Sequence, residues 1–355
     1  MISKVGIRNF KSLENLDLDC KRINLFIGKP NVGKSNILEC LSLFGSLSTE
    51  NIRLESIRNL FYDQDVRRLI NIRVDDHRYL AGYDARTQTY NSYVIDSTYY
   101  ETDNHQPSIL ESHSIDQDVN FFERLSSENT FEFVLSRDTV AENGHLVNKS
   151  VLEEPNFPKV KMYSYRELTA DADTTKNHNS LSLMSPHGEN IFHLLKDNKS
   201  LLQEVSDLFK DYGYSLIIDF VTNKAEIQKL VGNIGFKIPY SLVADTLKRV
   251  VFYIVAIRTN ENCSILLEEP ENHSFPPYIR DIAFEVINSK NQFFIATHSP
   301  YMLNTIVSEA KKEEVSINIV TYADFKTKVK TMTQEEISEL SDYGVDLFFN
   351  LNVFQ

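Results

Sequence analysis

The sequence predicts an α/β fold with an antiparallel β part near the N-terminus and a parallel core near the C-terminus. Three observations predict it. Apolar and polar residues alternate along residues 4–10, as in a half-buried strand. Residues 265–267 and 293–296 are short, fully apolar runs typical of buried parallel strands, and a helix predicted for 277–289 separates them as in a βαβ unit. An apolar stripe at helical spacing predicts a further helix over 241–258.

Other elements follow in chain order. Strands are predicted for 16–19 and 22–27, a loop for 28–35, a helix for 36–47, several strands between 70 and 134, a polar connection over 138–158 and helices within 186–211. We therefore expect three parts: an N-terminal lobe over 1–160, a helical insertion with return strands over 161–240, and a C-terminal lobe over 241–355.

Composition bounds the classes of protein that the chain can belong to. At 355 residues, with 42% hydrophobic and 25% charged residues, it suits one large or two ordinary globular domains. A net charge of −13 argues against a protein that coats nucleic acid through bulk positive charge. Cys20, Cys40 and Cys263 form no CxxC pair, so neither a disulfide framework nor a zinc knuckle is indicated.

The chain shows no segment suited to a membrane or to export. Its longest apolar run, 250–257, is far shorter than the roughly 20 residues of a spanning helix. The first residues lead directly into a strand pattern and lack the apolar core of a signal peptide. We therefore expect a cytoplasmic protein with no membrane contact.

The strongest motif is GxxxxGK[ST], which lies between the predicted strand 22–27 and the following helix. It comprises Gly28, Lys29, Pro30, Asn31, Val32, Gly33, Lys34 and Ser35. The glycines allow backbone N–H groups to curl around a phosphate, and the helix N-terminus adds its positive dipole end. Lys34 is expected to reach the β- and γ-phosphates and Ser35 to ligate Mg²⁺. The motif thus predicts an ATP site over residues 28–36, with Asn36 as its last member.

A pair of carboxylates follows the predicted strand that ends at residue 267. Ligands of open α/β sheets bind at the carboxyl ends of parallel strands, which is where Glu268 and Glu269 stand. We expect Glu268 to hold the metal and Glu269 to act as the general base toward the attacking water. Taken alone, the pair could be two solvated glutamates at a strand end; the phosphate loop favours the functional interpretation.

A histidine follows the next apolar strand. His298 comes directly after 293–296 and Thr297, so it is expected at the same edge of the sheet, facing the γ-phosphate. A lone histidine more often has a structural role, but this position is the one that the site requires. The catalytic residues predicted from the sequence are therefore Lys34, Glu269 and His298.

With these elements in order, the chain resembles the ABC-type ATPase heads of the SMC, RecF and OLD families. It is most similar to stand-alone AAA-family ATPases of bacterial phage-defence systems. The residues that carry the resemblance are 7–13, the phosphate loop, 268–273 and 296–300. It covers the first 45 and roughly the last 120 residues well. It implies an ABC-ATPase-like head, with a helical lid that begins near 186–190.

The resemblance also implies a signature segment that caps the ATP of a partner subunit. Residues 241–249 hold its place, with Ser241, Asp245 and Thr246 as candidate ATP-binding residues. The family usually has a glycine near Thr246, and this chain has none there. An ordinary capped core helix is the alternative interpretation. Gln64 is a candidate for the family's Q-loop glutamine.

The resemblance implies an ATP-hydrolysing switch whose cofactors are ATP and Mg²⁺. Two copies would sandwich ATP, as a homodimer or higher oligomer, and control a separate effector in bacterial antiviral defence. Because the 55 residues after Pro300 hold no acidic DxD cluster, a nuclease is expected to be such a separate protein. The alternatives are a RecF- or SMC-like ATPase that binds DNA and a scaffold that binds ATP without hydrolysis. DNA binding would use a local patch comprising Lys4, Arg8, Lys11, Lys21 and Arg22.

Overall fold

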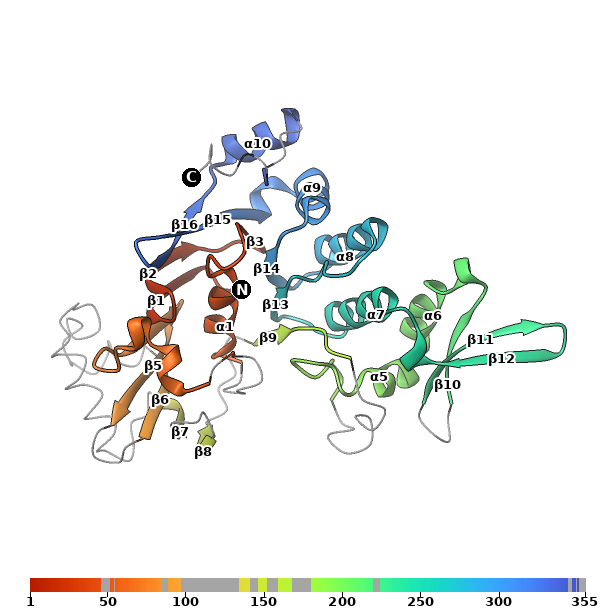
Figure 1. The fold of residues 1–355 in the computed structure, drawn as a ribbon, viewed down its shortest axis with the longest axis horizontal. Coiled ribbons are helices and arrows are strands. Elements are labelled where there is room, and N and C mark those ends of the chain that lie inside the picture. The colour runs from red at the N-terminus through yellow and green to blue at the C-terminus, as the bar shows by residue number, and fades with distance from the viewer. Residues whose placement is uncertain are drawn as a thin grey trace.

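The computed structural model describes residues 1–45, 52–53, 55–84, 89–96, 134–140, 146–151, 159–167, 180–219, 224–343, 347–348 and 350. These residues form a seven-stranded, a six-stranded and a three-stranded sheet, together with the helices that cover them (Figure 1). The predicted α/β class, with an antiparallel part and a parallel core, is confirmed.

The six-stranded sheet positions the candidate site. Its order is β16 (Lys326–Thr331), β15 (Val315–Ala323), β3 (Ile23–Ile27), β14 (Gln292–Thr297), β13 (Ser264–Glu268) and β9 (Val160–Tyr163). All neighbouring pairs are parallel except β15 with β16. Glu268 pairs with Ala296, and Thr297 pairs with Ile27, so three strands end together at one edge. In parallel sheets, this edge is where ligands bind.

The seven-stranded sheet is antiparallel throughout. Its order is β2 (Leu13–Asp19), β1 (Lys4–Phe10), β4 (Ile70–Val74), β5 (His77–Asp84), β6 (Thr89–Asp96), β7 (Val134–Val140) and β8 (Leu146–Val151). The polar connection predicted over 138–158 is therefore wrong in part, because β7 and β8 occupy much of it. Polar residues there pair as strands because the sheet supplies hydrogen-bonding neighbours that a local pattern cannot reveal.

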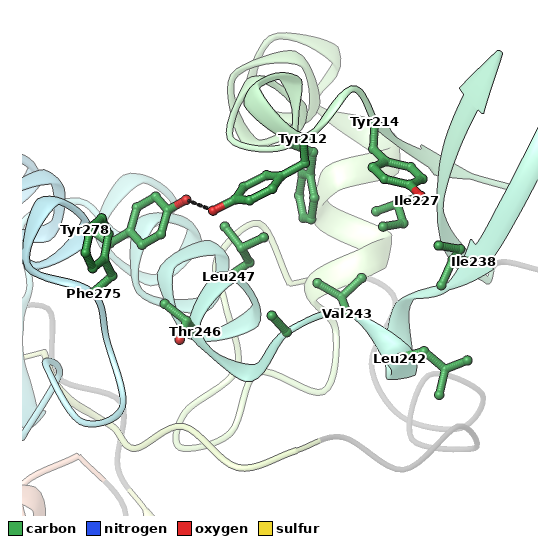
Figure 2. A pocket seen from close by; sticks show the side chains of 12 residues that line it. Tyr212, Tyr214, Ile227, Ile238, Leu242, Val243, Thr246, Leu247, Phe275 and Tyr278 are labelled. Carbon is green, nitrogen blue, oxygen red and sulfur yellow. Dashed lines mark hydrogen bonds between the residues drawn. The ribbon is translucent and has the colours of Figure 1, made fainter. Parts of the chain in front are cut away.

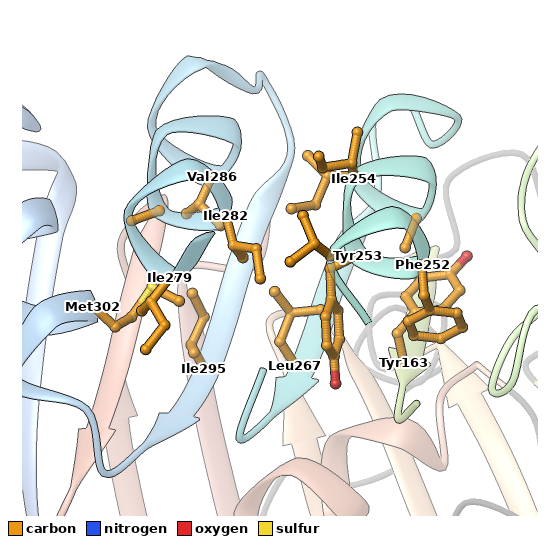
Figure 3. Close-up of a cluster of buried hydrophobic side chains, with 14 of the residues drawn as sticks. Tyr163, Phe252, Tyr253, Ile254, Leu267, Ile279, Ile282, Val286, Ile295 and Met302 are labelled. Carbon is orange, nitrogen blue, oxygen red and sulfur yellow. The ribbon is translucent and has the colours of Figure 1, made fainter. Parts of the chain in front are cut away.

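Helices cover both faces of the six-stranded sheet, and three of them pack on the face that points away from the antiparallel sheet. They are α7 (Asp245–Arg258), α8 (Pro276–Asn288) and α9 (Pro300–Glu309), whereas α1 (Lys34–Ser42) packs on the face toward the antiparallel sheet. Strand β3 serves both layers: Leu25 and Ile27 belong to the cluster with α7–α9, and Phe26 to the cluster with α1. Figure 3 shows the first cluster. Burial on both faces explains the fully apolar strands of the sequence. Helix α10 (Gln334–Tyr343) follows β16.

Two helices differ in extent from their predictions. The helix predicted for 36–47 ends at Ser42, and a turn brings Gly45 against β9, where a Cβ would lie 2.0 Å from the Val160 carbonyl oxygen. The helix predicted for 241–258 begins only at Asp245. Residues 240–242 form a 3-10 turn, and Val243 and Ala244 are extended with ψ of 147° and 134°. Ser241 is therefore not part of α7.

The insertion between β9 and α7, here called the lid (residues 191–239), is only partly helical. It contains α5 (Ile191–Asp197), α6 (Lys199–Asp207) and a sheet in the order β10 (Ser215–Ile218), β11 (Ala225–Val231), β12 (Ile234–Pro239). The β11–β12 hairpin extends away from the rest of the chain (Figure 1). The boundary expected at 160/161 falls inside β9. Among the described helices, none combines the length and the apolar character needed to cross a membrane.

Candidate functional site

The phosphate loop, residues 28–35, leaves β3 and leads directly into α1, as the motif predicts. Both glycines are required by close approaches. A Cβ on Gly28 would lie 2.2 Å from the Val320 carbonyl oxygen. Gly33 has a φ of +99°, and a Cβ there would lie 2.1 Å from Thr327 Oγ1. Because the loop turns so tightly, its backbone N–H groups lie close to the N-terminus of α1. N–H groups and the positive end of a helix dipole together favour the binding of an anion.

A hydroxyl pair supports the loop from outside. Thr327 Oγ1 donates to the Val32 carbonyl (2.8 Å) and lies 2.7 Å from Ser12 Oγ, which in turn accepts from Asn36 Nδ2 (2.7 Å). Sequence reasoning missed Ser12 and Thr327. No local signal could have linked them, because 315 residues separate the two hydroxyls.

Gly33→Ala is expected to abolish tight nucleotide binding, because the added methyl group collides with Thr327 and strains the loop. Gly232→Ala is the matched control, since Gly232 also has a positive φ (+61°) but no atom within 4 Å of the place where a Cβ would lie. The strain alone should cost both variants about 1–3 kcal/mol of unfolding free energy. Calorimetric titration with ATP and thermal unfolding would separate the two effects. Equal ATP affinity in both variants would contradict the close-packed loop.

Lys34 is buried and points back along its own loop. Its Nζ donates to the carbonyl oxygens of Gly28 (3.1 Å) and Lys29 (2.9 Å). Burial lowers the pKa of Lys34 to about 8, and the carboxylates of Glu269, Glu271 and Glu268 oppose that shift. A desolvated cation next to an N–H-lined loop is a strong phosphate ligand, because little water competes for it.

The two predicted carboxylates diverge after β13. Glu268 ends the strand, while Glu269 turns out of it with a φ of +43° and donates its N–H to the Ala296 carbonyl (2.9 Å). This turn brings Glu269 Oε1 to 3.4 Å from His298 Nε2, and Glu269 Oε2 accepts from Asn272 Nδ2 (2.7 Å). A non-glycine residue in this backbone region is strained, as is common at functional sites.

His298 lies 3.4 Å from Glu269 and near enough to Lys34 to feel its charge. Burial lowers the pKa of His298, the positive charge of Lys34 lowers it further, and Glu269 opposes the shift. A neutral imidazole has one N–H donor and one acceptor nitrogen, so His298 can donate to a phosphate oxygen or to an ionised carboxylate, but not to both at once. The structure thus brings together Lys34, Glu268, Glu269 and His298 at one edge of the sheet.

Glu268 has a partner that the sequence did not suggest. Arg53 donates to Glu268 Oε1 (3.0 Å) and to Glu39 Oε1 (2.9 Å), and Lys11 also pairs with the buried Glu39. One oxygen of the Glu268 carboxylate thus already holds a cation, Arg53, with which Mg²⁺ would compete. Together with the hydroxyl of Ser35, one carboxylate gives the oxygen donors that Mg²⁺ takes beside nucleotide phosphates. These residues fit the metal that the motif implies.

The candidate signature residues have other partners. Asp245 pairs with Arg249 (2.7 Å), and Thr246 Oγ1 donates to the His273 carbonyl (2.7 Å). The Ser241 carbonyl accepts from Lys248 Nζ (3.4 Å). Within the described residues, none of these contacts reaches the phosphate loop. Gln64 lies exposed in the 3-10 turn Tyr62–Gln64.

A pocket of about 360 Å³ separates this segment from the lid (Figure 2). Its wall is mostly apolar and aromatic and comes from the lid, from residues 242–247 and from the start of α8. The hydroxyls of Tyr212 and Tyr278 are 2.8 Å apart across it. Thr246 stands at its edge, so the pocket adjoins the turn that carries His273.

Three of the five basic residues suggested for DNA binding form ion pairs with carboxylates of this same chain. Arg8 pairs with Asp17 (2.8 Å), Lys11 with Glu39, and Arg22 with Glu314 (2.6 Å) as well as three backbone carbonyls. Three of the five charges are thus neutralised by carboxylates of the same chain, which weakens the case for a phosphate-binding patch.

Comparison with known proteins gives a family match. Residues 1–303 match a family model described as "AAA ATPase domain". An "ATP/GTP phosphatase" of Helicobacter pylori (strain ATCC 700392 / 26695) is 24% identical over 342 residues, with 84% of this chain and 85% of that protein covered.

Solved structures with a similar fold include an SMC head bound to the C-terminal winged-helix domain of ScpA and the SMC head domain of Thermotoga maritima. The first has 15% identity and a TM-score of 0.49, covering 94% of this chain and 98% of that one. The second has 13% identity and a TM-score of 0.42, covering 94% and 99%.

Proposed function

This chain belongs to the AAA ATPase domain family and is an ATPase, and on that premise we propose that it is a switch closed by ATP and opened by hydrolysis. In the closed state, two copies would sandwich ATP between their phosphate loops and signature segments. The closed and open states would control a separate effector protein, a nuclease being one candidate, in bacterial antiviral defence.

The proposed chemistry uses the residues gathered at the sheet edge. Residues 28–36 would bind the phosphates through backbone N–H groups, with Lys34 neutralising charge on the γ-phosphate. Ser35 and Glu268 would hold Mg²⁺, which supplies charge neutralisation across the β- and γ-phosphate oxygens. Glu269 would accept a proton from the attacking water, and His298, beside Glu269, would donate its one N–H to the γ-phosphate.

One observation carries the dimer proposal. The loop, the carboxylates and His298 come from the carboxyl ends of β3, β13 and β14, whereas the contacts of the signature segment run to α7 and His273. A single copy therefore supplies one wall of a nucleotide site, and a second copy would supply the other. ATP would act as the shared ligand that stabilises the closed dimer.

Asp245→Arg tests this arrangement. The change is expected to spare ATP binding at the phosphate loop but to prevent ATP-dependent dimerisation and to suppress turnover by at least about tenfold, since a misplaced charge in an interface costs several kcal/mol. Asp207→Arg is the matched control, because the two side chains have nearly equal exposure (45% and 46%) and each pairs with a nearby cation of its own segment. Sizing chromatography with Mg-ATP and steady-state hydrolysis are the measurements. Wild-type turnover in Asp245→Arg would contradict the composite site.

The effector proposal rests on the family resemblance and needs a direct test. Affinity capture with the native protein, in ATP and in ADP, should recover a partner in one nucleotide state. A nucleic-acid shift assay with and without ATP distinguishes the DNA-binding alternative, which the internal pairing of Arg8, Lys11 and Arg22 disfavours. The scaffold alternative, which predicts no hydrolysis, conflicts with the ATPase family to which the chain belongs.

A further inference from the structure

A third glutamate lies in the turn after β13 and has no part in the chemistry above. Glu271 is only 9% exposed, and its Oε1 accepts two hydrogen bonds, from Thr297 Oγ1 (2.7 Å) and from the His298 backbone N–H (2.6 Å). We propose that Glu271 is a positioning residue for ATP hydrolysis, which fixes His298 relative to Glu269. This inference rests on the roles proposed for those two residues.

The hydrogen bonds of Glu271 order the whole histidine turn. Thr297 Oγ1, held by Glu271, accepts from the Ser299 N–H (3.0 Å), and Ser299 Oγ accepts from the Met302 N–H (3.3 Å) at the start of α9. The backbone on both sides of the His298 ring is therefore fixed by one carboxylate. Since the ring is attached to that backbone, its distance from the reacting atoms depends on Glu271.

The same turn holds the base candidate. Asn272 donates its N–H to the Glu269 carbonyl (3.0 Å) and its side-chain amide to Glu269 Oε2 (2.7 Å), and Ser274 N–H donates to the Glu271 carbonyl (2.9 Å). Glu269 and Glu271 thus belong to one hydrogen-bonded turn. A bond from this turn to the His298 amide joins the base and the histidine into one unit.

The turn is also tied to the signature segment, through the bond from Thr246 Oγ1 to the His273 carbonyl. A displacement of the start of α7, where the proposed partner would bind, is therefore passed directly to the turn that holds Glu269 and Glu271. In this way Glu271 would link partner binding to the placement of His298.

A role in stability alone explains Glu271 poorly. Burying a carboxylate is unfavourable unless all its acceptor capacity is used, and Glu271 Oε2 is buried without a hydrogen-bond partner in the described residues. Proteins retain destabilising residues of this kind mainly at functional sites, which favours a functional role for Glu271.

Glu271→Gln and Glu271→Ala test the proposal as a pair. The amide oxygen of glutamine can accept both hydrogen bonds, so Glu271→Gln should retain most activity. Glu271→Ala removes the acceptor and should lower kcat by about 10- to 100-fold, the effect expected for a small misplacement, with ATP affinity changed less than about threefold. Thr297→Val, which loses one of the two donors without changing side-chain volume much, should show a smaller fall in kcat of the same kind.

A long-range ¹H–¹⁵N spectrum of the histidine rings gives a readout independent of turnover. The His298 signal should shift in Glu271→Ala and stay near its wild-type position in Glu271→Gln. Wild-type kcat in both Glu271→Ala and Thr297→Val would overturn the proposal, as would equal losses in Glu271→Gln and Glu271→Ala or a parallel loss of ATP affinity. Full activity of Glu269→Gln, measured alongside, would instead show that the assigned base is wrong.

Discussion

Glu269→Gln is expected to bind ATP with near wild-type affinity but to hydrolyse it about 10²- to 10⁴-fold more slowly, which is the range for loss of a general base. Glutamine preserves the shape of the side chain. Its carbonyl oxygen can still accept the hydrogen bond from Asn272 that Glu269 Oε2 accepts now. What the variant loses is the proton acceptor beside His298. If opening requires loss of the γ-phosphate, the ATP-bound dimer should accumulate.

Glu268→Gln is the matched comparison, because it makes the same chemical change one residue earlier. Glu268 ends its strand against Arg53, not against His298, so its expected role is to hold the metal. This variant should therefore need more Mg²⁺ for ATP binding and should also turn over slowly. Single-turnover hydrolysis and sizing chromatography over a Mg²⁺ series would separate the two glutamates. Trapping of the dimer by Glu268→Gln, with Glu269→Gln active, would show that the two roles are reversed.

Lys34→Ala is expected to weaken ATP binding by at least about 100-fold, because charge-assisted hydrogen bonds to a desolvated cation contribute roughly 1.5–3 kcal/mol each. Hydrolysis should fall to the background rate. Because Lys34 is only 5% exposed, few water molecules compete with the phosphates for its ammonium group. Isothermal titration with Mg-ATP is the measurement.

Lys161→Ala controls for the removal of a desolvated lysine. Burial lowers the pKa of Lys161 as it does that of Lys34, but Lys161 Nζ donates to Ser182 and Asn260, away from the phosphate loop. Thermal unfolding of both variants would show whether either is simply unstable. Unchanged ATP affinity in a folded Lys34→Ala would refute the assignment of the phosphate loop.

Local sequence patterns were sufficient to predict most elements of the parallel core. The apolar strands β13 and β14, the helix between them and the phosphate loop each have a signal within about ten residues, because strand burial, helical periodicity and glycine geometry are encoded locally. Lys34 follows from the phosphate-loop motif, and Glu268, Glu269 and His298 follow because each stands just after a predicted strand. Composition and spacing also excluded a disulfide framework.

Other features depended on residues distant in the chain. The strands β7 and β8 form in a stretch that looks polar because neighbouring strands supply their hydrogen bonds. Helix α7 begins four residues later than its apolar stripe suggests, because the preceding segment is extended.

The phosphate loop with Lys34, the α/β class of the core, and the strand ends that carry Glu268, Glu269 and His298 could all be read from local sequence patterns. The partners of these residues became known only from the folded chain: Ser12 and Thr327 support the loop, Arg53 pairs with Glu268, and Glu271 accepts from the His298 N–H. The physical reason is that a motif fixes backbone geometry over a few residues, whereas hydrogen bonds and ion pairs form between whichever groups the parallel sheet brings together. Those partners are up to 315 residues apart and leave no periodic trace.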